Sequence, residues 1–284
     1  MTMPSLNIES QRSDVVVPKL FVTSDIHSYY EPLIEALNAA GFDKDNEDHW
    51  LIVCGDCFDR GPDSGLVLKF LMELERKILV KGNHDLLLQE CCEREYPCSH
   101  DYHNGTVKTI QDLGDMGSGY AFDACCRTTW NKLARYRELL VNYFETENYI
   151  FVHSWIPTGV HYEGTMKPWY QQGKTLTWME DWRDANDVEW EEAMWGNPFI
   201  KAEQDLNKTG KTIVFGHWHC STGHSMLHRT KGSDVESEST ISEFEDDAIW
   251  EPYKSDKYDI IGIDRCVAHT GKLNVLVLED NFIE

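Results

Sequence analysis

An α/β fold is predicted for this chain by two features of its 284-residue sequence. Short apolar runs rich in Val, Ile, Leu and Phe recur along the chain, and helical patterns separate the first three of them. Alternation of strands and helices predicts a parallel sheet with right-handed crossovers. The hydrophobic content of 41% is sufficient for one large globular domain with a substantial core, or for two small domains.

Seven apolar runs are predicted to form buried strands. In chain order they are Lys19–Thr23, Trp50–Val53, Ile78–Val80, Tyr149–Val152, Thr212–Phe215, Tyr258–Ile263 and Leu273–Leu278. Helices are predicted over Glu31–Ala40 and Gly65–Glu75, and a third is predicted to begin near Asp85. These elements give a β-α-β-α-β-α opening.

Three segments interrupt this pattern and are interpreted as insertions. The first, at about 95–147, is Cys- and His-rich and then helical, with a helix expected around Asn131–Tyr143. The second, at about 155–208, contains six tryptophans and is expected to form an aromatic wall rather than part of the sheet core. The third, 232–247, reads as an acidic loop rich in Ser, Glu and Asp.

The remaining pattern shows no internal repeat and no clear linker. We therefore expect one domain over residues 19–280, preceded by an N-terminal extension, residues 1–18. These first eighteen residues lack the basic start and apolar run of a signal peptide. No stretch is long and apolar enough for a membrane span. Nine cysteines, an odd number, favour reduced thiols, so a cytoplasmic location and no membrane partner are expected.

The chain is strongly acidic. Lys+Arg number 26 against 49 Asp+Glu, which gives a formal net charge of -23. Such a field repels phosphate backbones, so duplex nucleic acid is not expected as a partner. A compact phosphorylated ligand is compatible with the charge if metal ions hold it, because bound cations invert the local sign.

Five predicted strands are followed by residues that bind metals or handle phosphate. These segments are Ser24-Asp25-Ile26-His27, Gly55-Asp56-Cys57-Phe58-Asp59-Arg60-Gly61, Gly82-Asn83-His84-Asp85, Val152-His153-Ser154 and Gly216-His217-Trp218-His219. Ligands of open α/β sheets bind at the carboxyl ends of the strands, so these segments should converge. The glycines before Asp56, Asn83 and His217 would let the backbone approach the site closely.

The side chains in these segments offer carboxylate oxygens, an amide oxygen and imidazole nitrogens. This donor set suits Mn, Fe or Zn better than calcium or an all-sulfur zinc site. Asp56 can bridge two metals through its two oxygens. Two ions about 3.5–4 Å apart would clamp a phosphoryl group, lower the pKa of a shared water and orient the bridging hydroxide for attack.

The five segments, in this order, resemble the calcineurin-like metallophosphoesterase superfamily. The Asp59-Arg60-Gly61 ending and the Gly82–Asp85 motif are most similar to the phosphoprotein phosphatase branch, which includes bacterial and phage-type Ser/Thr phosphatases and symmetrical diadenosine tetraphosphatases. Ile263–Leu273 is similar to the Asp-Thr-Gly-Cys…Gly-Gly-x-Leu ending of that branch. The resemblance spans Phe21–Leu278 and implies a metallophosphoesterase fold, a central β-sandwich of mixed sheets flanked by helices and carrying helical insertions.

The resemblance also implies a role for each site residue. The first metal would be held by Asp25, His27 and Asp56, and the second by Asp56, Asn83, His153 and His217. His84 would protonate the leaving oxygen, Asp59 would orient the His84 ring, and Arg60 would hold the phosphate. Two divalent metal ions are expected, manganese first, with Fe, Zn or Ni as alternatives.

The chain departs from the branch at four places. Ser28 replaces a glycine, and Arg265 and Cys266 replace Thr-Gly. His219 corresponds to a histidine found elsewhere in the superfamily and is expected as an additional ligand of the first metal. A second phosphate-binding arginine is missing where Trp195 and its neighbours lie, and Arg183 is the nearest substitute.

Structural interpretations of these residues remain open. Asp59 and His84 could be a hydrogen-bonded pair that only orients metal ligands, and Arg60 could cap the next helix or pair with Asp63. Redox use of the C-x-x-C pattern at Cys54–Cys57 is disfavoured because it surrounds Asp56. A zinc site is less favoured than a helical cap with incidental thiols for Cys91, Cys92, Cys98, His100 and His103.

The predicted function is metal-dependent hydrolysis of a phosphomonoester, with a phosphoserine or phosphothreonine protein as the leading substrate. The alternative is a dinucleoside polyphosphate such as diadenosine tetraphosphate, whose adenine the tryptophans could stack. A hypothesis from another functional class is that the chain is a catalytically silent phosphate-binding or regulatory protein. It would be expected to have lost a metal ligand or the His84–Asp59 pair, and neither is missing. A nucleic-acid phosphodiesterase is opposed by the acidity.

Overall fold

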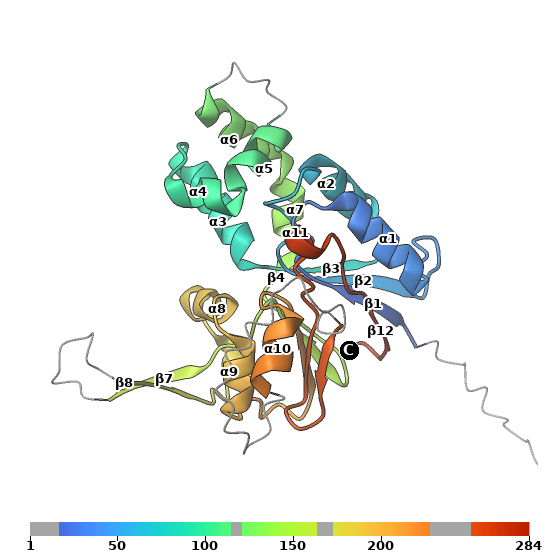
Figure 1. Ribbon diagram of the computed structural model, residues 1–284, viewed down its shortest axis with the longest axis vertical. Coiled ribbons are helices and arrows are strands. Elements are labelled where there is room, and N and C mark those ends of the chain that lie inside the picture. Colours follow the sequence, from blue (N-terminus) through green and yellow to red (C-terminus); the bar gives the residue numbers. More distant parts are fainter. Residues whose placement is uncertain (1–16, 115–120, 164–172, 228–250, 284) are drawn as a thin grey trace, which may run out of the picture.

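Two five-stranded sheets pack against each other in the computed structural model, with helices on their outer faces (Figure 1). The structure describes residues 17–114, 121–163, 173–227 and 251–283. The acidic loop predicted over 232–247 and most of the N-terminal extension lie outside these residues. The expected β-sandwich of mixed sheets flanked by helices is confirmed.

The first sheet contains the three strands that open the chain. Its order is β12 (Leu276–Glu279), β1 (Lys19–Thr23), β2 (His49–Cys54), β3 (Lys77–Val80) and β4 (Leu140–Val141). The strands β1 to β4 are parallel, and β12 alone is antiparallel to its neighbour β1. The parallel sheet predicted from the β-α-β-α-β opening is therefore present, with one antiparallel edge strand.

The second sheet is mixed. Its order is β10 (Tyr253–Ser255), β11 (Ile260–Gly262), β9 (Thr212–Phe215), β6 (Tyr149–Phe151) and β5 (Phe144–Glu145). The three central strands are parallel, and the two edge strands are antiparallel to them. The short strands β4, β5 and β10 were not predicted because two or three residues are too few to show a period.

Alternation along β1 shows how the strands fill both sides of the first sheet. Leu20 and Val22 point into the sandwich, where they pack with Phe151 and Val214 of the second sheet. Phe21 points to the opposite face and joins the cluster beneath the helices. The core thus has one layer between the sheets and one layer under each set of helices.

Helices α1 (Tyr30–Ala40), α2 (Ser64–Glu73) and α3 (Asn83–Arg94) follow β1, β2 and β3 as predicted. The first insertion continues with four further helices: α4 (Ser99–Asn104), α5 (Thr106–Leu113), α6 (Phe122–Lys132) and α7 (Ala134–Glu138). They gather with α3 at one end of the molecule (Figure 1). The helical stretch expected around Asn131–Tyr143 is present only in part: α7 ends at Glu138, and residues 140–141 pair with the free edge of β3 as strand β4.

The second insertion covers the outer face of the second sheet. It contains the hairpin of β7 (Gly159–Glu163) and β8 (Gly173–Thr177), a 3-10 turn at Trp182–Asp184, α8 (Asp187–Met194) and α9 (Pro198–Glu203). The hairpin projects from the rest of the molecule (Figure 1). After β9 comes α10 (Cys220–Leu227), and α11 (Val267–Thr270) follows β11.

The expected aromatic wall outside the sheet core was wrong for three of the tryptophans. Trp155, Trp182 and Trp190 are buried and pack in one cluster with Ile213 and Phe215 of β9. They are part of the sheet core because the insertion connects the parallel strands β6 and β9, and its helices α8 and α9 pack on this face. In the described part of the chain, no helix has the length and apolar character needed to cross a membrane.

Candidate metal centre

The six predicted metal ligands come together at the carboxyl ends of strands from both sheets. Asp25 and His27 follow β1, Asp56 follows β2, and Asn83 begins α3 directly after β3. From the second sheet, His153 follows β6 and His217 follows β9. All are buried except His217, which is half-buried.

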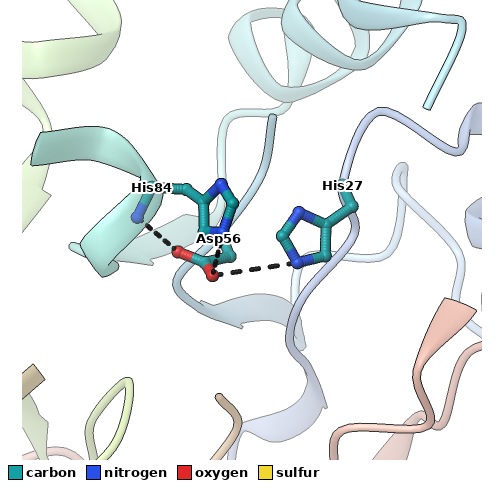
Figure 2. A group of neighbouring side chains, drawn as sticks. All are labelled: His27, Asp56 and His84. Carbon is teal, nitrogen blue, oxygen red and sulfur yellow. Dashed lines mark hydrogen bonds and ion pairs between the residues drawn. The ribbon is translucent and has the colours of Figure 1, made fainter. Parts of the chain in front are cut away.

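The Asp56 carboxylate lies at the middle of this group. Its Oδ2 atom is 3.8 Å from Nε2 of His27, 3.9 Å from Nε2 of His84 and 3.5 Å from Nε2 of His153. Figure 2 shows His27 and His84 on either side of Asp56. These distances are longer than good hydrogen bonds, so the nitrogens surround the carboxylate oxygen without bonding to it.

A second group shares the same carboxylate. Ligand atoms of Asp56, His153 and His217 all lie within 4.8 Å of one another. The Asn83 Oδ1 atom is 2.7 Å from His153 Nε2, and Asp25 Oδ1 is 3.8 Å from His27 Nε2. The six residues therefore form two adjoining clusters joined by Asp56.

The orientation of two imidazoles fits a metal ligand set. His27 Nδ1 lies 2.9 Å from the Phe58 carbonyl oxygen, and His153 Nδ1 lies 2.9 Å from that of Cys54. A carbonyl that accepts from Nδ1–H fixes the tautomer with a free electron pair on Nε2, as in many metal sites. His27 Nε2 is buried and has no hydrogen-bond partner among the described residues. Such a nitrogen is costly unless a cation uses it.

The backbone of the site is held in an uncommon conformation. Positive φ angles, between 49° and 73°, occur at Asp25, His27, Asp56, Asp59, Arg60 and His217. Side chains other than glycine rarely adopt this left-handed region, and such strain clusters at functional sites. Ser28, where the family resemblance predicts glycine, has a φ of 61° as well.

Close backbone packing requires glycine at two positions. A Cβ atom on Gly82 would overlap the Asp56 side chain, and one on Gly216 would overlap Asp25 Oδ2. The predicted close approach before Asn83 and His217 is therefore present. Gly82 and Gly216 let the chain pass directly behind the two carboxylates.

Burial and like charge dominate the electrostatics. Burial, with the neighbouring Asp264 and Asp56 carboxylates, raises the pKa of Asp25 well above its usual range. Burial also acts to raise the pKa of Asp56, but the histidines around it, His153 first, outweigh burial and lower this pKa. A divalent cation between the carboxylates would relieve the repulsion at Asp25.

The imidazoles of His27 and His217, one from each cluster, are kept neutral. Burial, followed by the positive charges of Arg60 and His84, lowers the pKa of His27 well below its usual range. Burial and His153 lower the pKa of His217 to about 3. Neutral imidazole is the form that binds metals.

A hydrogen-bonded chain leads away from the centre through His84. Its Nδ1 atom is 2.8 Å from Asp59 Oδ2, and the Thr106 hydroxyl donates to the same oxygen at 2.7 Å. Burial acts to lower the pKa of His84, but the carboxylates of Asp56 and Asp59 outweigh it, so the pKa is raised. This pair can hold a proton on His84 beside the metal clusters.

Arg60 lies on the open side of His84. Its side chain is exposed, and its Nη2 atom donates to His84 Nε2 at 3.2 Å. An ion pair with Asp63, one of the two structural interpretations of Arg60, does not occur among the described residues. Its guanidinium instead contacts His84, one of the imidazoles around Asp56.

Two predictions outside the six residues have different outcomes. His219 Nε2 is 3.8 Å from Asp264 Oδ2 and belongs to neither three-ligand group, so its role as a ligand stays a prediction. Arg183 forms a two-pronged ion pair with Glu145 at 2.9 and 2.7 Å and stacks on Trp182, which gives it a structural partner.

The cysteine patterns do not form a ligand set. Cys54 and Cys57 are buried beside Asp56, and burial raises the pKa of both thiols, so they stay protonated. In the described residues, neither three-ligand group contains a cysteine. Cys91 and Cys92 are buried on α3, whereas Cys98 is exposed at the start of α4.

Asp264 is a site residue that the sequence reasoning missed. It follows β11, is only 3% exposed, and is one of the carboxylates that raise the pKa of Asp25. Burial raises the pKa of Asp264 itself. The signal was available, because a sixth predicted strand, Tyr258–Ile263, is also followed by an acidic residue.

Comparison with known proteins gives a family match. A family model described as calcineurin-like phosphoesterase matches residues 18–221, well over half of the chain. The symmetrical bis(5'-nucleosyl)-tetraphosphatase of Nitrosospira multiformis is 35% identical over 97 residues, 34% of this chain and 34% of that protein. The protein of the same name from Aeromonas hydrophila subsp. hydrophila is 46% identical over 65 residues, 22% of this chain and 23% of that protein.

The match to these curated relatives thus spans about a third of their length or less. Among solved structures, a cold-active protein tyrosine phosphatase gives a TM-score of 0.49 at 14% identity, covering 93% of this chain and 76% of the other. A serine/threonine phosphatase from Saccharomyces cerevisiae gives a TM-score of 0.44 at 14% identity, covering 72% and 62% of the two chains.

Proposed function

This chain belongs to the calcineurin-like phosphoesterase family, and on that premise we propose that it hydrolyses a phosphoric ester or anhydride with the help of two divalent metal ions. The observation that carries the proposal is the Asp56 carboxylate, surrounded by imidazole nitrogens at 3.5 to 3.9 Å. The catalytic unit is the single domain of residues 19–280.

The donor set supports the proposed division of ligands. Asp25, His27 and Asp56 would hold one ion, with His219 as an additional ligand, and Asp56, Asn83, His153 and His217 would hold the other. When bound, two such ions supply an acidified water and neutralise charge on the phosphoryl oxygens. Manganese is the first candidate, with Fe, Zn or Ni as alternatives.

His84 is the proposed general acid. The Asp59 carboxylate fixes the ring through Nδ1, so Nε2 is the nitrogen that can deliver a proton to the leaving oxygen. Without substrate, Nε2 accepts a hydrogen bond from Arg60. A phosphate that draws the guanidinium to itself would free Nε2 to carry the proton.

Arg60 is the proposed phosphate clamp. Its planar guanidinium can donate two parallel hydrogen bonds to a phosphate, a geometry that lysine lacks. It is exposed next to the buried His84, so it can reach a substrate that arrives from solvent. Binding and proton delivery would then be coupled through one side chain.

Among substrates, we favour a dinucleoside polyphosphate over the phosphoprotein expected from sequence. The curated relatives with 35% and 46% identity are both named symmetrical bis(5'-nucleosyl)-tetraphosphatases. A net charge of -23 also disfavours stable docking on acidic partner surfaces, whereas a small nucleotide needs only the metal centre and a local pocket.

The test of the chemistry uses the purified chain stripped with chelator and reloaded with manganese. We expect metal-dependent turnover of diadenosine tetraphosphate, and a loss of about 100-fold or more in kcat for His84→Asn. Asp56→Asn should lose most metal binding as well as turnover. Full activity of the stripped protein would refute the proposal.

The test of the substrate compares kcat/KM for diadenosine tetraphosphate with that for a phosphoserine peptide and an aryl phosphate under the same metal loading. A preference for the dinucleotide supports the favoured reading. A preference for the peptide would indicate a phosphoprotein substrate, and the proposed metal chemistry would still stand.

A further inference from the structure

A large cavity lies between α8, α9 and the base of the β7–β8 hairpin. Its volume is about 670 Å³, within the range of small-molecule sites. One face of α8 and one face of α9 line it, together with residues at the two ends of the hairpin. The lining side chains that matter most are Leu176, Val188, Glu191, Glu192, Trp195 and Ile200.

Two contacts join this cavity to the metal centre. The Trp195 ring lies edge-on to the His217 ring, with centroids 6.3 Å apart. The Ser154 hydroxyl, next in sequence to His153, donates to the Gly196 carbonyl oxygen at 2.6 Å. Two residues of the cavity wall, Trp195 and Gly196, therefore lie next to His217 and to the neighbour of His153.

The chemistry of the walls selects against phosphate and for a planar uncharged group. Val188, Ile200 and Trp195 are large apolar residues that stay exposed, Trp195 by 45%. Three glutamates, Glu189, Glu191 and Glu192, line the cavity against one lysine, Lys201, so the net charge of the walls disfavours anions. A ring that stacks on indole and donates hydrogen bonds to carboxylate suits these walls.

We propose that this cavity binds one nucleobase of a nucleotide substrate, stacked on Trp195, with its exocyclic amino group directed to Glu191 or Glu192. The proposal rests on the proposed function, in which the phosphates lie at the metal centre. Adenine has such an amino group, and hypoxanthine carries a carbonyl at the same ring position. The acidic cavity then separates the base from the phosphates and sets the orientation of the substrate.

The first experiment truncates the indole. Trp195→Ala should lower kcat/KM for diadenosine tetraphosphate by about tenfold or more, as expected when one stacked base loses its aromatic partner. The loss should be several-fold smaller for inorganic tetraphosphate, which has the same anhydride bonds without a base. Tyr102→Ala removes an aromatic ring that is 63% exposed on α4 and is the matched control, with no loss on either substrate. Equal losses of Trp195→Ala on both substrates would overturn the proposal, because Trp195 would then act only through His217.

The second experiment tests the carboxylates. The wild-type protein should prefer diadenosine over diinosine tetraphosphate by about tenfold or more, the range for a site that loses its hydrogen-bond partner. The double variant Glu191→Gln, Glu192→Gln should reduce this preference, because an amide accepts both bases. An unchanged preference would overturn the role of the carboxylates.

The third experiment separates failure of the cavity from failure of the proposed function. Adenosine, titrated into the metal-free protein, should shift one indole N–H resonance that is missing in Trp195→Ala. If adenosine binds there and no substrate is hydrolysed, the proposed chemistry fails and the base site stands. The base site is refuted by a combination of three results. Hydrolysis is found, adenosine shifts no Trp195 signal, and the hydrolysis of an arginine-flanked phosphopeptide depends on Glu191 and Glu192.

Discussion

Individual residues of this site carry backbone strain where the side chains must converge. The left-handed conformation costs a residue other than glycine about 1–2 kcal/mol. Asp25, His27, Asp56 and His217 all adopt it, so their side chains face one another from different strand ends. Residues that cannot be replaced by glycine because of their chemistry must accept this cost.

Ser28 provides a direct measure of that cost. It has a φ of 61°, is fully buried, and its hydroxyl shares a hydrogen bond of 3.0 Å with that of Ser64. Ser28→Ala and Ser28→Gly both remove this hydrogen bond, so the difference between them isolates the backbone. We expect the glycine variant to be more stable than the alanine variant by about 1 kcal/mol, the reverse of the usual order. Urea unfolding of the metal-free proteins measures this difference in stability. An alanine variant at least as stable as the glycine variant would contradict backbone strain at this position.

Asp85 is a residue whose environment predicts a pH dependence. Burial raises its pKa to about 7, although the Gly82 N–H and the Tyr136 hydroxyl both donate to it. A raised pKa means that its contribution to folding is present below the unfolded pKa of about 4 and is lost as the pH rises through 7. Asp85 also borders a cavity of about 300 Å³, where water can screen the charge.

Asp85→Asn should therefore gain stability relative to the wild type as the pH increases from 4.5 to 8. The amide can accept from Gly82 N–H and donate to the Tyr136 oxygen, so both contacts survive. After allowance for screening, the relative gain should be no more than about 2 kcal/mol. Chemical unfolding of both metal-free proteins at several pH values measures the difference, and a constant difference would show that Asp85 has an ordinary pKa.

At the scale of elements, helix α5 of the first insertion supports the catalytic pair. Thr106 donates to Asp59 Oδ2, and the Thr109 hydroxyl accepts from the Asp59 backbone N–H at 3.0 Å. Asp59 in turn holds His84. The insertion is thus part of the proposed active site as well as a cover for the sheet.

Removal of the Thr106 hydroxyl should weaken catalysis more than binding. Thr106→Val is expected to lower kcat by about 5- to 30-fold, the effect of losing one hydrogen bond to a charged group, with little change in KM. Thr106→Ser should restore most of the activity because it returns the donor. Steady-state kinetics and the pH profile of kcat measure both effects.

The matched control for this change is Thr129→Val on α6. Thr129 is also fully buried, and its hydroxyl donates to the Ile110 carbonyl oxygen of α5 rather than to Asp59. The Thr129→Val variant should lose stability, but the pH profile of its kcat should not change. Similar profiles for the two valine variants would mean that Thr106 acts only through the packing of the insertion.

The elements that could be predicted from sequence are those whose signal is local. The strands before Asp25, Asp56 and Asn83 are continuous, largely apolar runs, and polar residues or glycine follow them directly. The short strand at residues 140–141 could not be predicted, since it exists only because β3 offers a free edge. Thr106 was also missed because its partner, Asp59, is 47 positions away and threonine has no motif of its own.

At the scale of the whole molecule, the proposed metal centre lies at the junction of the two sheets. Asp25, His27, Asp56 and Asn83 follow strands of the first sheet, whereas His153 and His217 follow strands of the second. The same junction gathers the buried carboxylates of Asp25, Asp56 and Asp264 in a chain of net charge -23. Without cations, repulsion at this point opposes folding.

Binding of divalent metal should therefore stabilise the entire chain. Manganese at 100 times its dissociation constant adds about 2.7 kcal/mol to the free energy of unfolding, or a rise of roughly 5–10 °C in Tm for a chain of this size. Asp56→Asn should lose most of this rise, because both ligand groups share Asp56. Asp112→Asn changes an exposed carboxylate on α5, and this variant should keep the full rise in Tm. Thermal unfolding with manganese or with chelator measures each shift. An equal rise in Asp56→Asn would place the stabilising ion elsewhere and separate metal binding from the junction of the two sheets.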